Sequence, residues 1–157
     1  MDAQDDSKGP GVKVPPPLIV VAVVMAAYGL HQWVPLNLPF AELCRWLGSA
    51  LMTLGLLILL FAAAAFFRAK TAIEPWKPAR VLMTDGLYRF SRNPIYLALY
   101  LIQIGLGLYL AQGWIVLSVI ISEGWIYRLV IKKEELYLEK AFGSEYCDYK
   151  SRVRRYI

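Results

Sequence analysis

Four long apolar runs constrain what this chain can fold into. A helix that crosses a membrane needs about 20 predominantly apolar residues, with a range of roughly 17–25. The chain has such runs at 18–34, 46–67, 95–112 and 114–131, each bounded by proline, glycine or charged residues. Hydrophobic residues make up 58% of the sequence, above the ~45–50% that is usual in a soluble domain. The pattern predicts an all-α, polytopic membrane protein with four transmembrane helices.

The polar segments between and after these runs predict how the helices are connected. Only Gly113 separates the third run from the fourth, so we expect a tight helical hairpin there. Residues 133–142 mix apolar and charged side chains, and Gly143 can end a helix. A second short helix can begin at Ser144. We expect these C-terminal helices to lie at the membrane interface and to cover a site.

The distribution of basic residues predicts the orientation. All but one of the 17 Lys and Arg residues lie in the N-terminal tail, in the loop between the second and third runs, or after residue 127; the exception is Arg45. Four spans place those three segments on one face, and the positive-inside rule makes that face cytoplasmic, together with both termini. The net charge of +5 therefore indicates topology and some attraction to membrane lipids, and not nucleic-acid binding.

The first residues of the chain differ in composition from the rest. Residues 1–14 are mainly polar, contain Pro and Gly, and are expected to form a disordered tail before a single membrane-embedded domain at 15–157. The two cysteines, Cys44 and Cys147, are too few for a disulfide framework and are expected on opposite sides of the membrane, so they should not pair. His31 is the only histidine, and we expect no metal site.

The first candidate site precedes the third run. Pro94 suits the first turn of a helix, which places Arg92 and Asn93 at its N-terminal end. The helix dipole and the free backbone N–H groups favour an anion there, and Arg92 adds a bidentate donor for a carboxylate or phosphate. Tyr88 and Tyr96 supply flat apolar surface with a polar tip. The alternative is that the arginines only anchor the span in the membrane.

The second candidate site follows the last run. Glu123, Tyr127, Val130 and Glu134 are spaced to lie on one face of a helix, and Glu135 is one step further round. A glutamate within a span is costly and usually faces the bundle interior. The paired acids can accept hydrogen bonds from hydroxyls or an ammonium group, or act as a base. The alternative for the pair is a solvated charged surface, and for Glu123 a buried acid that pairs with a neighbour such as Gln103.

These two regions resemble a known family. The sequence "DGLYRFSRNPIYLALYL", then an apolar hairpin, then "EELYLEKAFGSEYCDYKSRVRRYI", is similar to the isoprenylcysteine carboxyl methyltransferase family. That family belongs to a wider group of membrane methyltransferases that includes phospholipid N-methyltransferases. The resemblance covers about residues 71–157, a little over half of the chain.

The resemblance implies a membrane-embedded enzyme that uses S-adenosylmethionine. By the same resemblance, the cofactor would be held by Tyr88, Arg92, Asn93, Pro94, Tyr96, Glu134 and Glu135. Asn93 is a departure, because the better-known eukaryotic members have His there. An Asn side chain donates hydrogen bonds but does not titrate near neutral pH, so cofactor binding is expected at this position and general base catalysis is not.

The methyl acceptor would be a lipophilic molecule that enters between the spans, while the cofactor enters from the cytosol. The reaction that the resemblance suggests first is carboxyl O-methylation of an isoprenylcysteine, in which Arg128 would orient the carboxylate. The second is phospholipid N-methylation, in which Glu134 would act as the catalytic base.

Two other classes of protein remain open from the sequence. A small four-span transporter of cationic compounds would use Glu123 as its membrane-embedded acid. An assembly or accessory protein would have no activity. Cofactor binding distinguishes both classes from the methyltransferase.

Overall fold

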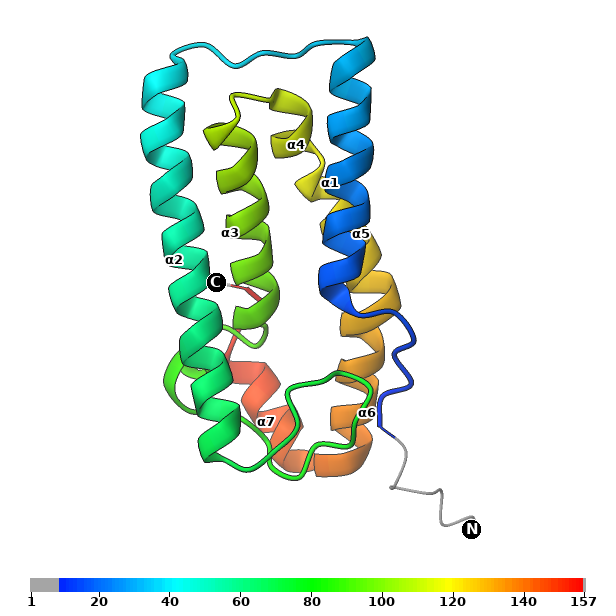
Figure 1. Cartoon of the computed structure of the whole chain (residues 1–157). Coiled ribbons are helices and arrows are strands. Elements are labelled where there is room, and N and C mark those ends of the chain that lie inside the picture. The colour runs from blue at the N-terminus through cyan, green and yellow to red at the C-terminus, as the bar shows by residue number, and fades with distance from the viewer. Residues whose placement is uncertain (1–8, 157) are drawn as a thin grey trace.

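The computed structural model describes residues 9–156 and is all-helical (Figure 1). Three helical stretches are long and apolar enough to cross a membrane: α1 (Pro16–Trp33), α2 (Ala41–Arg68) and the stretch Gly113–Phe142. A fourth apolar helix, α3 (Pro94–Tyr109), is shorter, with 16 residues. The structure is that of a multi-pass, all-α membrane protein, as the apolar runs predicted.

The stretch Gly113–Phe142 differs from the prediction, which ended a span at residue 131 and began a separate helix at 133. It is one long helix with local irregularities, divided into α4 (Gly113–Leu117), α5 (Val119–Ile126), a π-helical turn η2 (Tyr127–Ile131) and α6 (Lys132–Phe142). In the π turn the N–H of Lys132 donates to the Tyr127 carbonyl, five residues back. A turn of this kind holds one residue more than an α-helical turn.

The expected hairpin between the third and fourth runs is present. Helix α3 ends at Tyr109, and residues 110–112 turn the chain into α4, with Ala111 at a positive φ of 53°. Two backbone hydrogen bonds join this turn to the linker 34–40 between α1 and α2. Leu38 N–H donates to the Ala111 carbonyl, and Gly113 N–H donates to that of Leu36. We call this part of the bundle, residues 34–40 and 110–112 with the adjoining turns of α2, α3 and α4, the linker end.

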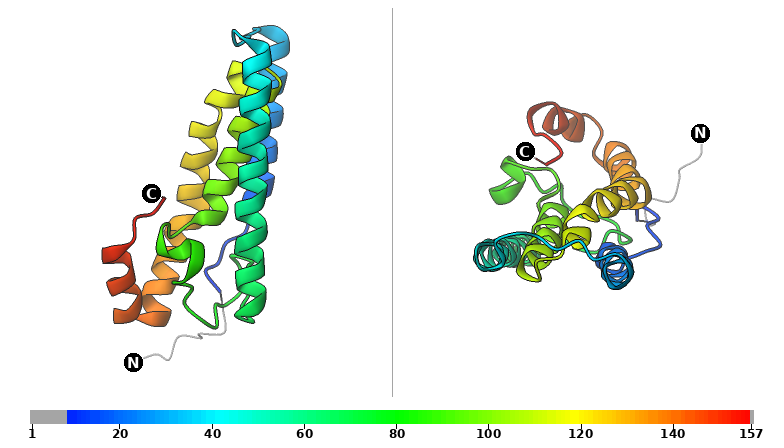
Figure 2. Two further views of the ribbon diagram at one scale, coloured as in Figure 1. Left: turned by 90° about the vertical axis from the view of Figure 1, so that its left-hand side faces the viewer. Right: turned by 90° about the horizontal axis from the view of Figure 1, so that it is seen from above.

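Helices α2 and α3 form the most extensive helix contact, while α1 stands on the other side of α3 (Figure 2). The α2–α3 contact depends on small residues. A Cβ atom on Gly48 would lie 2.5 Å from the Gly105 carbonyl oxygen, and one on Gly105 would lie 2.7 Å from the Gly48 oxygen. Helices in a membrane pack this closely only where small residues let the backbones approach.

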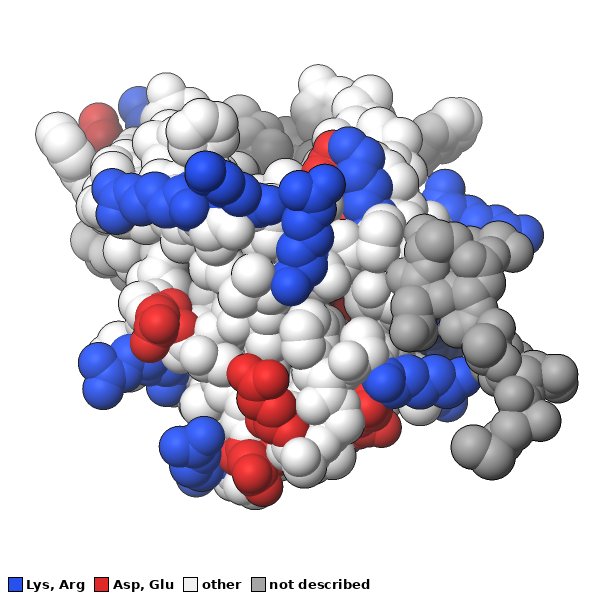
Figure 3. All heavy atoms as spheres, turned by 90° about the horizontal axis from the view of Figure 1, so that it is seen from below, with Lys and Arg blue, Asp and Glu red and all other residues white. Residues whose placement is uncertain are grey.

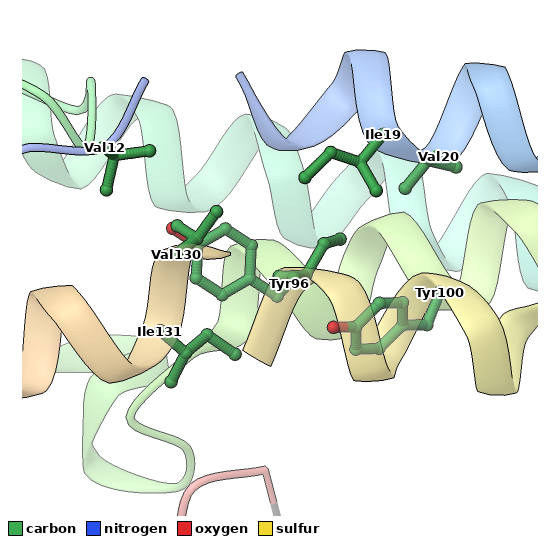
Figure 4. Close-up of a cluster of buried hydrophobic side chains, with 8 residues drawn as sticks. Val12, Ile19, Val20, Tyr96, Tyr100, Val130 and Ile131 are labelled. Atoms are coloured by element: carbon green, nitrogen blue, oxygen red, sulfur yellow. The ribbon is translucent and has the colours of Figure 1, made fainter. Parts of the chain in front are cut away.

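A buried cluster joins α1, α3 and the last long helix (Figure 4). Ile19 and Val20 come from α1, Tyr96 and Tyr100 from α3, and Ile126, Val130 and Ile131 from the stretch around the π turn. All of these side chains are at most 9% exposed, and they hold the three helices together. The outer sides of α1 and α2 instead expose large apolar residues, such as Leu57, Leu60 and Phe61, as a lipid-facing surface does.

The segment before α1 also packs against this cluster. Val12 is buried among its members, and Lys133 Nζ donates to the Gly11 carbonyl at 3.4 Å. Residues 9–14 of the expected tail therefore include contacts with the helices. The remainder of that tail, residues 1–8, lies outside the described part of the chain.

The opposite end of the bundle, which we call the cavity end, gathers α6, the loop 69–93 and helix α7 (Ser144–Arg152) (Figure 1). Gly143, at a φ of 54°, makes the turn between α6 and α7. A second buried cluster of Leu82, Tyr146 and Tyr149 fixes α7 against the loop. Figure 3 views the molecule from this side and shows Lys and Arg side chains around its rim.

Candidate functional site

A cavity of about 510 Å³ lies at the cavity end. Its walls come from the last turns of α2, the start of α3, helices α6 and α7, the loop 72–83 and the residues that lead into α1. Binding sites for small molecules and cofactors commonly have volumes of roughly 300–1,000 Å³ and combine apolar walls with a few polar groups. The cavity matches that description in size and, as described below, in chemistry.

Six of the residues that the sequence singled out line the cavity: Tyr88, Arg92, Asn93, Tyr96, Glu134 and Glu135. They come from three separate elements, the short 3-10 helix η1 (Gly86–Arg89), the start of α3 and the start of α6. Pro94 is buried in the first turn of α3 and does not line the cavity. Arg128 is exposed on the π turn and does not line it either.

Arg92 and Glu135 form an ion pair at the cavity wall. The Arg92 Nη1 atom lies 3.0 Å from Glu135 Oε1, and the two side chains are only 9% and 12% exposed. The same nitrogen donates to the Tyr146 hydroxyl at 3.3 Å. Arg92 Nε is buried and has no hydrogen-bond partner among the described residues. Buried polar groups in folded proteins nearly always have partners, so this nitrogen is a candidate contact for a ligand.

Glu134 has a different environment from its neighbour. Its Oε2 accepts a hydrogen bond of 2.8 Å from the Tyr96 hydroxyl. No Lys or Arg of the described residues lies within ion-pair distance of it. Two consecutive acids therefore have separate tasks: Glu135 holds a guanidinium, whereas Glu134 presents a carboxylate that can accept a proton or bind a cation.

The π turn explains why Glu134 and Glu135 have different partners. The α-helical spacing predicted Glu123, Tyr127 and Glu134 on one face. The extra residue in the turn shifts this register by one position, so the face that carries Glu123 and Tyr127 continues to Glu135. The C-terminal segment covers that face: the Arg155 guanidinium lies 4.8 Å from the Tyr127 ring centre and binds Glu135, while the Tyr156 hydroxyl donates to Glu123 Oε1.

Glu123 accordingly lies outside the cavity. The expected partner, Gln103, instead donates to the Ser118 hydroxyl at 2.8 Å, and Glu123 accepts its hydrogen bond from Tyr156 at 3.2 Å. Glu123 therefore has a neighbouring partner, as one alternative expected, but the partner is Tyr156 and Glu123 is only partly buried.

The C-terminal segment 153–156 is a part of the site that sequence reasoning missed. The Arg154 carbonyl accepts from Arg92 N–H at 3.0 Å, and the Arg155 carbonyl accepts from Asn93 N–H, Asn93 Nδ2 and the Ser91 hydroxyl. These bonds fix the chain just before α3, where its N–H groups have no partner within the helix. Its signals in the sequence are a run of basic residues, which indicates topology, and its place at the end of the second stretch that carries the family resemblance.

Two buried tyrosines close the cavity on the side of α7. The Tyr149 hydroxyl donates to the Tyr88 carbonyl at 2.7 Å. Burial raises the pKa of both Tyr88 and Tyr149 well above the usual value for a phenol. Both hydroxyls therefore stay neutral at physiological pH, and the Tyr149 hydroxyl remains a donor.

The cavity also has an apolar side toward the bundle. Leu59, Ala63 and Phe66 of α2 face Ile95 and Leu99 of α3 across it. A polar ligand can bind between Arg92 and Glu134, and an apolar chain can lie against the helices. The arrangement suits a reaction between one polar and one lipophilic molecule.

Comparison with known proteins supports a common origin for this arrangement. The sequence profile of a family described as phospholipid methyltransferase matches residues 43–145. An uncharacterized protein of Haemophilus influenzae is 43% identical over 63 residues, which cover 40% of this chain and 100% of that protein.

Among solved structures, the chain is similar to the eukaryotic intramembrane Ras methyltransferase ICMT, an isoprenylcysteine carboxyl methyltransferase. The TM-score is 0.53 and the identity 22%, over 87% of this chain and 50% of that one. This chain therefore spans about half of the length of that protein, and the likeness is one of fold.

Proposed function

Because this chain belongs to the phospholipid methyltransferase family, we propose that its cavity binds S-adenosylmethionine and that it methylates a lipophilic acceptor at the cytoplasmic face of a membrane. Methyltransferases of this family and of the isoprenylcysteine group are membrane enzymes that use this cofactor. When bound, it supplies a methyl group on a positively charged sulfur. The observation that carries the proposal is a single cavity that joins a polar, charged wall to an apolar one.

The residues of the cavity fit the cofactor. Its amino-acid part has a carboxylate, and Arg92 in the wall has a buried Nε atom without a hydrogen-bond partner among the described residues. Tyr88 and the edges of the loop 72–83 supply flat and apolar surface for the adenosine part. Asn93 uses its amide to hold the C-terminal segment, so in this proposal it shapes the site indirectly.

The protein contributes position and a dry environment. Methyl transfer requires the acceptor atom to approach in line with the bond that breaks, so correct placement supplies much of the rate. Leu59, Phe66 and Leu99 exclude water from the side where the lipophilic molecule would lie, and charges interact more strongly where water is absent.

The polar groups of the cavity favour an amine as the acceptor. A carboxylate acceptor, as in isoprenylcysteine O-methylation, needs a cation to orient it, and Arg128, which we expected in that task, is exposed outside the cavity. An ammonium acceptor must first lose a proton, and Glu134 lies in the cavity as a base. We therefore place N-methylation of a lipid amine first and carboxyl O-methylation second.

We also propose four spans with both termini in the cytoplasm. Helix α3 has 16 residues, which gives about 24 Å at ~1.5 Å per residue, somewhat less than the ~30 Å of a bilayer core. The turn 110–112 and the residues before Pro94 complete its crossing. The basic loop and C-terminal segment around the cavity support the orientation, because such segments stay in the cytoplasm.

The first test is calorimetric titration of the detergent-purified chain with S-adenosylmethionine and with its demethylated product. We expect saturable binding of both. Arg92→Ala should weaken binding by about 1.5–3 kcal/mol, the value of a hydrogen bond to a charged group. Arg89→Ala is the matched control, because Arg89 is exposed and does not line the cavity.

Two results would contradict the proposal. If the folded protein bound neither compound, the methyltransferase assignment would fail, and a proton-coupled transport role for Glu123 would be tested next. If Arg92→Ala bound the cofactor as tightly as the unaltered protein, Arg92 would be a membrane anchor only.

The acceptor is tested separately with purified protein in nanodiscs. One preparation contains phosphatidylethanolamine, and another contains a farnesylated cysteine derivative in a phosphatidylcholine bilayer. Transfer of radiolabel from the cofactor to the first lipid supports an amine acceptor. Transfer only to the farnesylated acid would reverse our order of the two acceptors.

A further inference from the structure

Two arginines share one carboxylate at the cavity wall. Glu135 Oε1 lies 3.0 Å from Arg92 Nη1 and 3.0 Å from Arg155 Nε, and Glu135 Oε2 accepts from Arg155 Nη2 at 3.1 Å. Arg155 thus binds Glu135 with two parallel hydrogen bonds, the strongest geometry for such a pair. The group Arg92–Glu135–Arg155, which we call the triad, carries two positive charges and one negative charge.

The net charge of the triad decides what it can bind. Arg92 and Glu135 alone would form a neutral pair with little attraction for an anion. With Arg155 present, one positive charge remains uncompensated by any acid within ion-pair distance among the described residues. The buried Arg92 Nε without a partner lies in the same group, so the surplus charge and a free donor coincide.

Three other charged residues line the cavity. Glu74 and Lys77 of the loop pair with each other, and Glu134 has the opposite sign to the triad. Glu134 lies next in sequence and faces Tyr96, so the cavity has a positive site at the triad and a negative site at Glu134. A free amino acid, or the amino-acid part of a larger ligand, has the same two charges on one carbon atom. The triad therefore matches the carboxylate of such a ligand, while Glu134 keeps its proposed role as the base.

We propose that Arg155 is a positioning residue that makes the triad cationic, and that the cofactor's carboxylate is recognised because Arg155 neutralises Glu135 and leaves the positive charge of Arg92 uncompensated. This inference rests on the proposed function and adds to it the group that selects the amino-acid end of the cofactor. Arg155 acts through Glu135 and Arg92, and its own side chain is 34% exposed.

The structural contribution of this segment comes mainly from its backbone. The carbonyl of Arg155 accepts the bonds from Ser91 and Asn93, and a change of side chain keeps that carbonyl. Side-chain variants of Arg155 therefore change the charge of the triad while most of the packing of the segment stays in place. Arg155→Gln removes the charge, and Arg155→Lys keeps it without the two-pronged geometry.

The experiment compares two probes, S-adenosylmethionine and decarboxylated S-adenosylmethionine, which differ only in the carboxylate. Both are titrated calorimetrically into the detergent-purified full chain. We expect the unaltered protein to prefer the carboxylated probe, and Arg155→Gln to reduce that preference about tenfold, the size of one charged hydrogen bond. Affinity for the decarboxylated probe should stay the same. Arg155→Lys should restore part of the preference.

Arg152→Gln is the control for the loss of one positive charge in the same region. Arg152 is exposed at the end of α7 and donates only to the Asp148 carbonyl in its own helix. It should retain the full preference for the carboxylated probe, because it does not touch the triad.

Each result has a separate meaning. If Arg155→Gln weakened both probes equally, Arg155 would have a packing role only, and the inference would be overturned. An unaltered protein that bound both probes with the same affinity would also overturn it, because the carboxylate would then not be recognised. If it bound neither probe, the proposed function itself would fail.

Discussion

The two ends of the bundle are built from different interactions. At the linker end, backbone groups meet directly: Gly113 N–H reaches the Leu36 carbonyl at 2.8 Å, and Gly48 and Gly105 let α2 and α3 approach closely. At the cavity end the helices separate around about 510 Å³ of space. Long polar side chains and the segment 153–156 bridge the separated elements there. The close backbone contact at Gly48 and Gly105 therefore lies away from the cavity.

Such a division has a physical reason. A close-packed interior leaves no room for a ligand, and a ligand site keeps polar groups that cost stability when no ligand is bound. Arg92 Nε is such a group. The close contact at the linker end can offset this cost because it lies in the same helices, α2 and α3. Changes at one end should therefore affect function, and changes at the other should affect stability.

The largest effect is expected from Glu134→Gln at the cavity end. The change keeps the shape of the side chain but removes the carboxylate that we propose as the base. Methyl transfer should fall by roughly 10²–10⁴-fold, the usual contribution of a general base, whereas the unfolding temperature should change little. The measurement is transfer of radiolabel from the cofactor, with circular dichroism on the same sample.

The control for this change is Glu145→Gln, because Glu145 is exposed on α7 and does not line the cavity. It should retain activity. Full activity in Glu134→Gln would remove Glu134 from the catalytic residues and would leave it, at most, a contact for the cofactor.

At the linker end, the largest effect is expected from Gly48→Ala. The new methyl group would lie 2.5 Å from both the Gly105 oxygen and the Tyr109 nitrogen, which are backbone atoms and cannot turn away. We expect the free energy of unfolding to fall by about 3 kcal/mol, as in other overpacked interiors. Thermal unfolding in detergent measures it.

Gly29→Ala is the matched control, since a Cβ atom on Gly29 of α1 meets nothing within 4 Å. Alanine is the better helix former by about 0.5–1 kcal/mol, so this variant should be as stable as the unaltered protein or more so. Equal unfolding temperatures for the two variants would show that the α2–α3 contact adjusts to the extra methyl group.

A smaller effect at the cavity end is expected from Tyr149→Phe. It leaves the Tyr88 carbonyl without its donor, which should cost about 2 kcal/mol as for other buried acceptors that lose a partner. Because Tyr88 and Tyr149 both line the cavity, cofactor affinity should fall as well. The Gly48→Ala variant should keep its cofactor affinity at temperatures where it is folded.

Tyr28→Phe is its control, because the Tyr28 ring is 44% exposed on α1. A Tyr149→Phe protein that lost stability but bound the cofactor normally would mean that α7 is not needed to close the cavity. Calorimetric titration and thermal unfolding of both variants provide the measurement.

The smallest effect is expected from Trp114→Phe. Trp114 Nε1 donates to the Val34 carbonyl at 2.7 Å in an exposed position at the linker end. Loss of one such bond should lower the free energy of unfolding by about 1 kcal/mol. Trp125→Phe, on the exposed side of α5, should lower it less. If the Trp114→Phe variant were fully folded but had lost methyl transfer, the division of stability and function between the two ends would be contradicted.

The predictions from sequence were successful where the signal is local. Apolar runs, Pro94 and Gly113 indicated the helices and the hairpin, because membrane insertion and helix termination depend on neighbouring residues. Arg92, Asn93 and Tyr96 share one helix start and all line the cavity, and their part in cofactor binding stays a prediction.

The predictions from sequence failed where a distant contact or a change of helical register determines which residues meet. An ideal helix grouped Glu123 with Glu134, and the π turn moved Glu123 to the face of Glu135. Arg155 meets Glu135 only because Gly143 reverses the chain between them. The spacing of these residues in the sequence predicts neither the chain reversal at Gly143 nor the extra residue in the π turn. The exposed position of Arg128 follows from the same turn.

We expect the length of α2 to set the depth of the cavity in the bilayer. Its 28 residues extend about 42 Å at ~1.5 Å per residue, whereas the hydrocarbon core measures ~30 Å. The surplus must be taken up by tilt or by extension into the headgroup layer. Ala63 and Phe66, in the last turns of α2, wall the cavity, so acyl chain length becomes a variable of the reaction. A thicker bilayer draws the apolar wall into the hydrocarbon, and a thinner one raises it toward the headgroups.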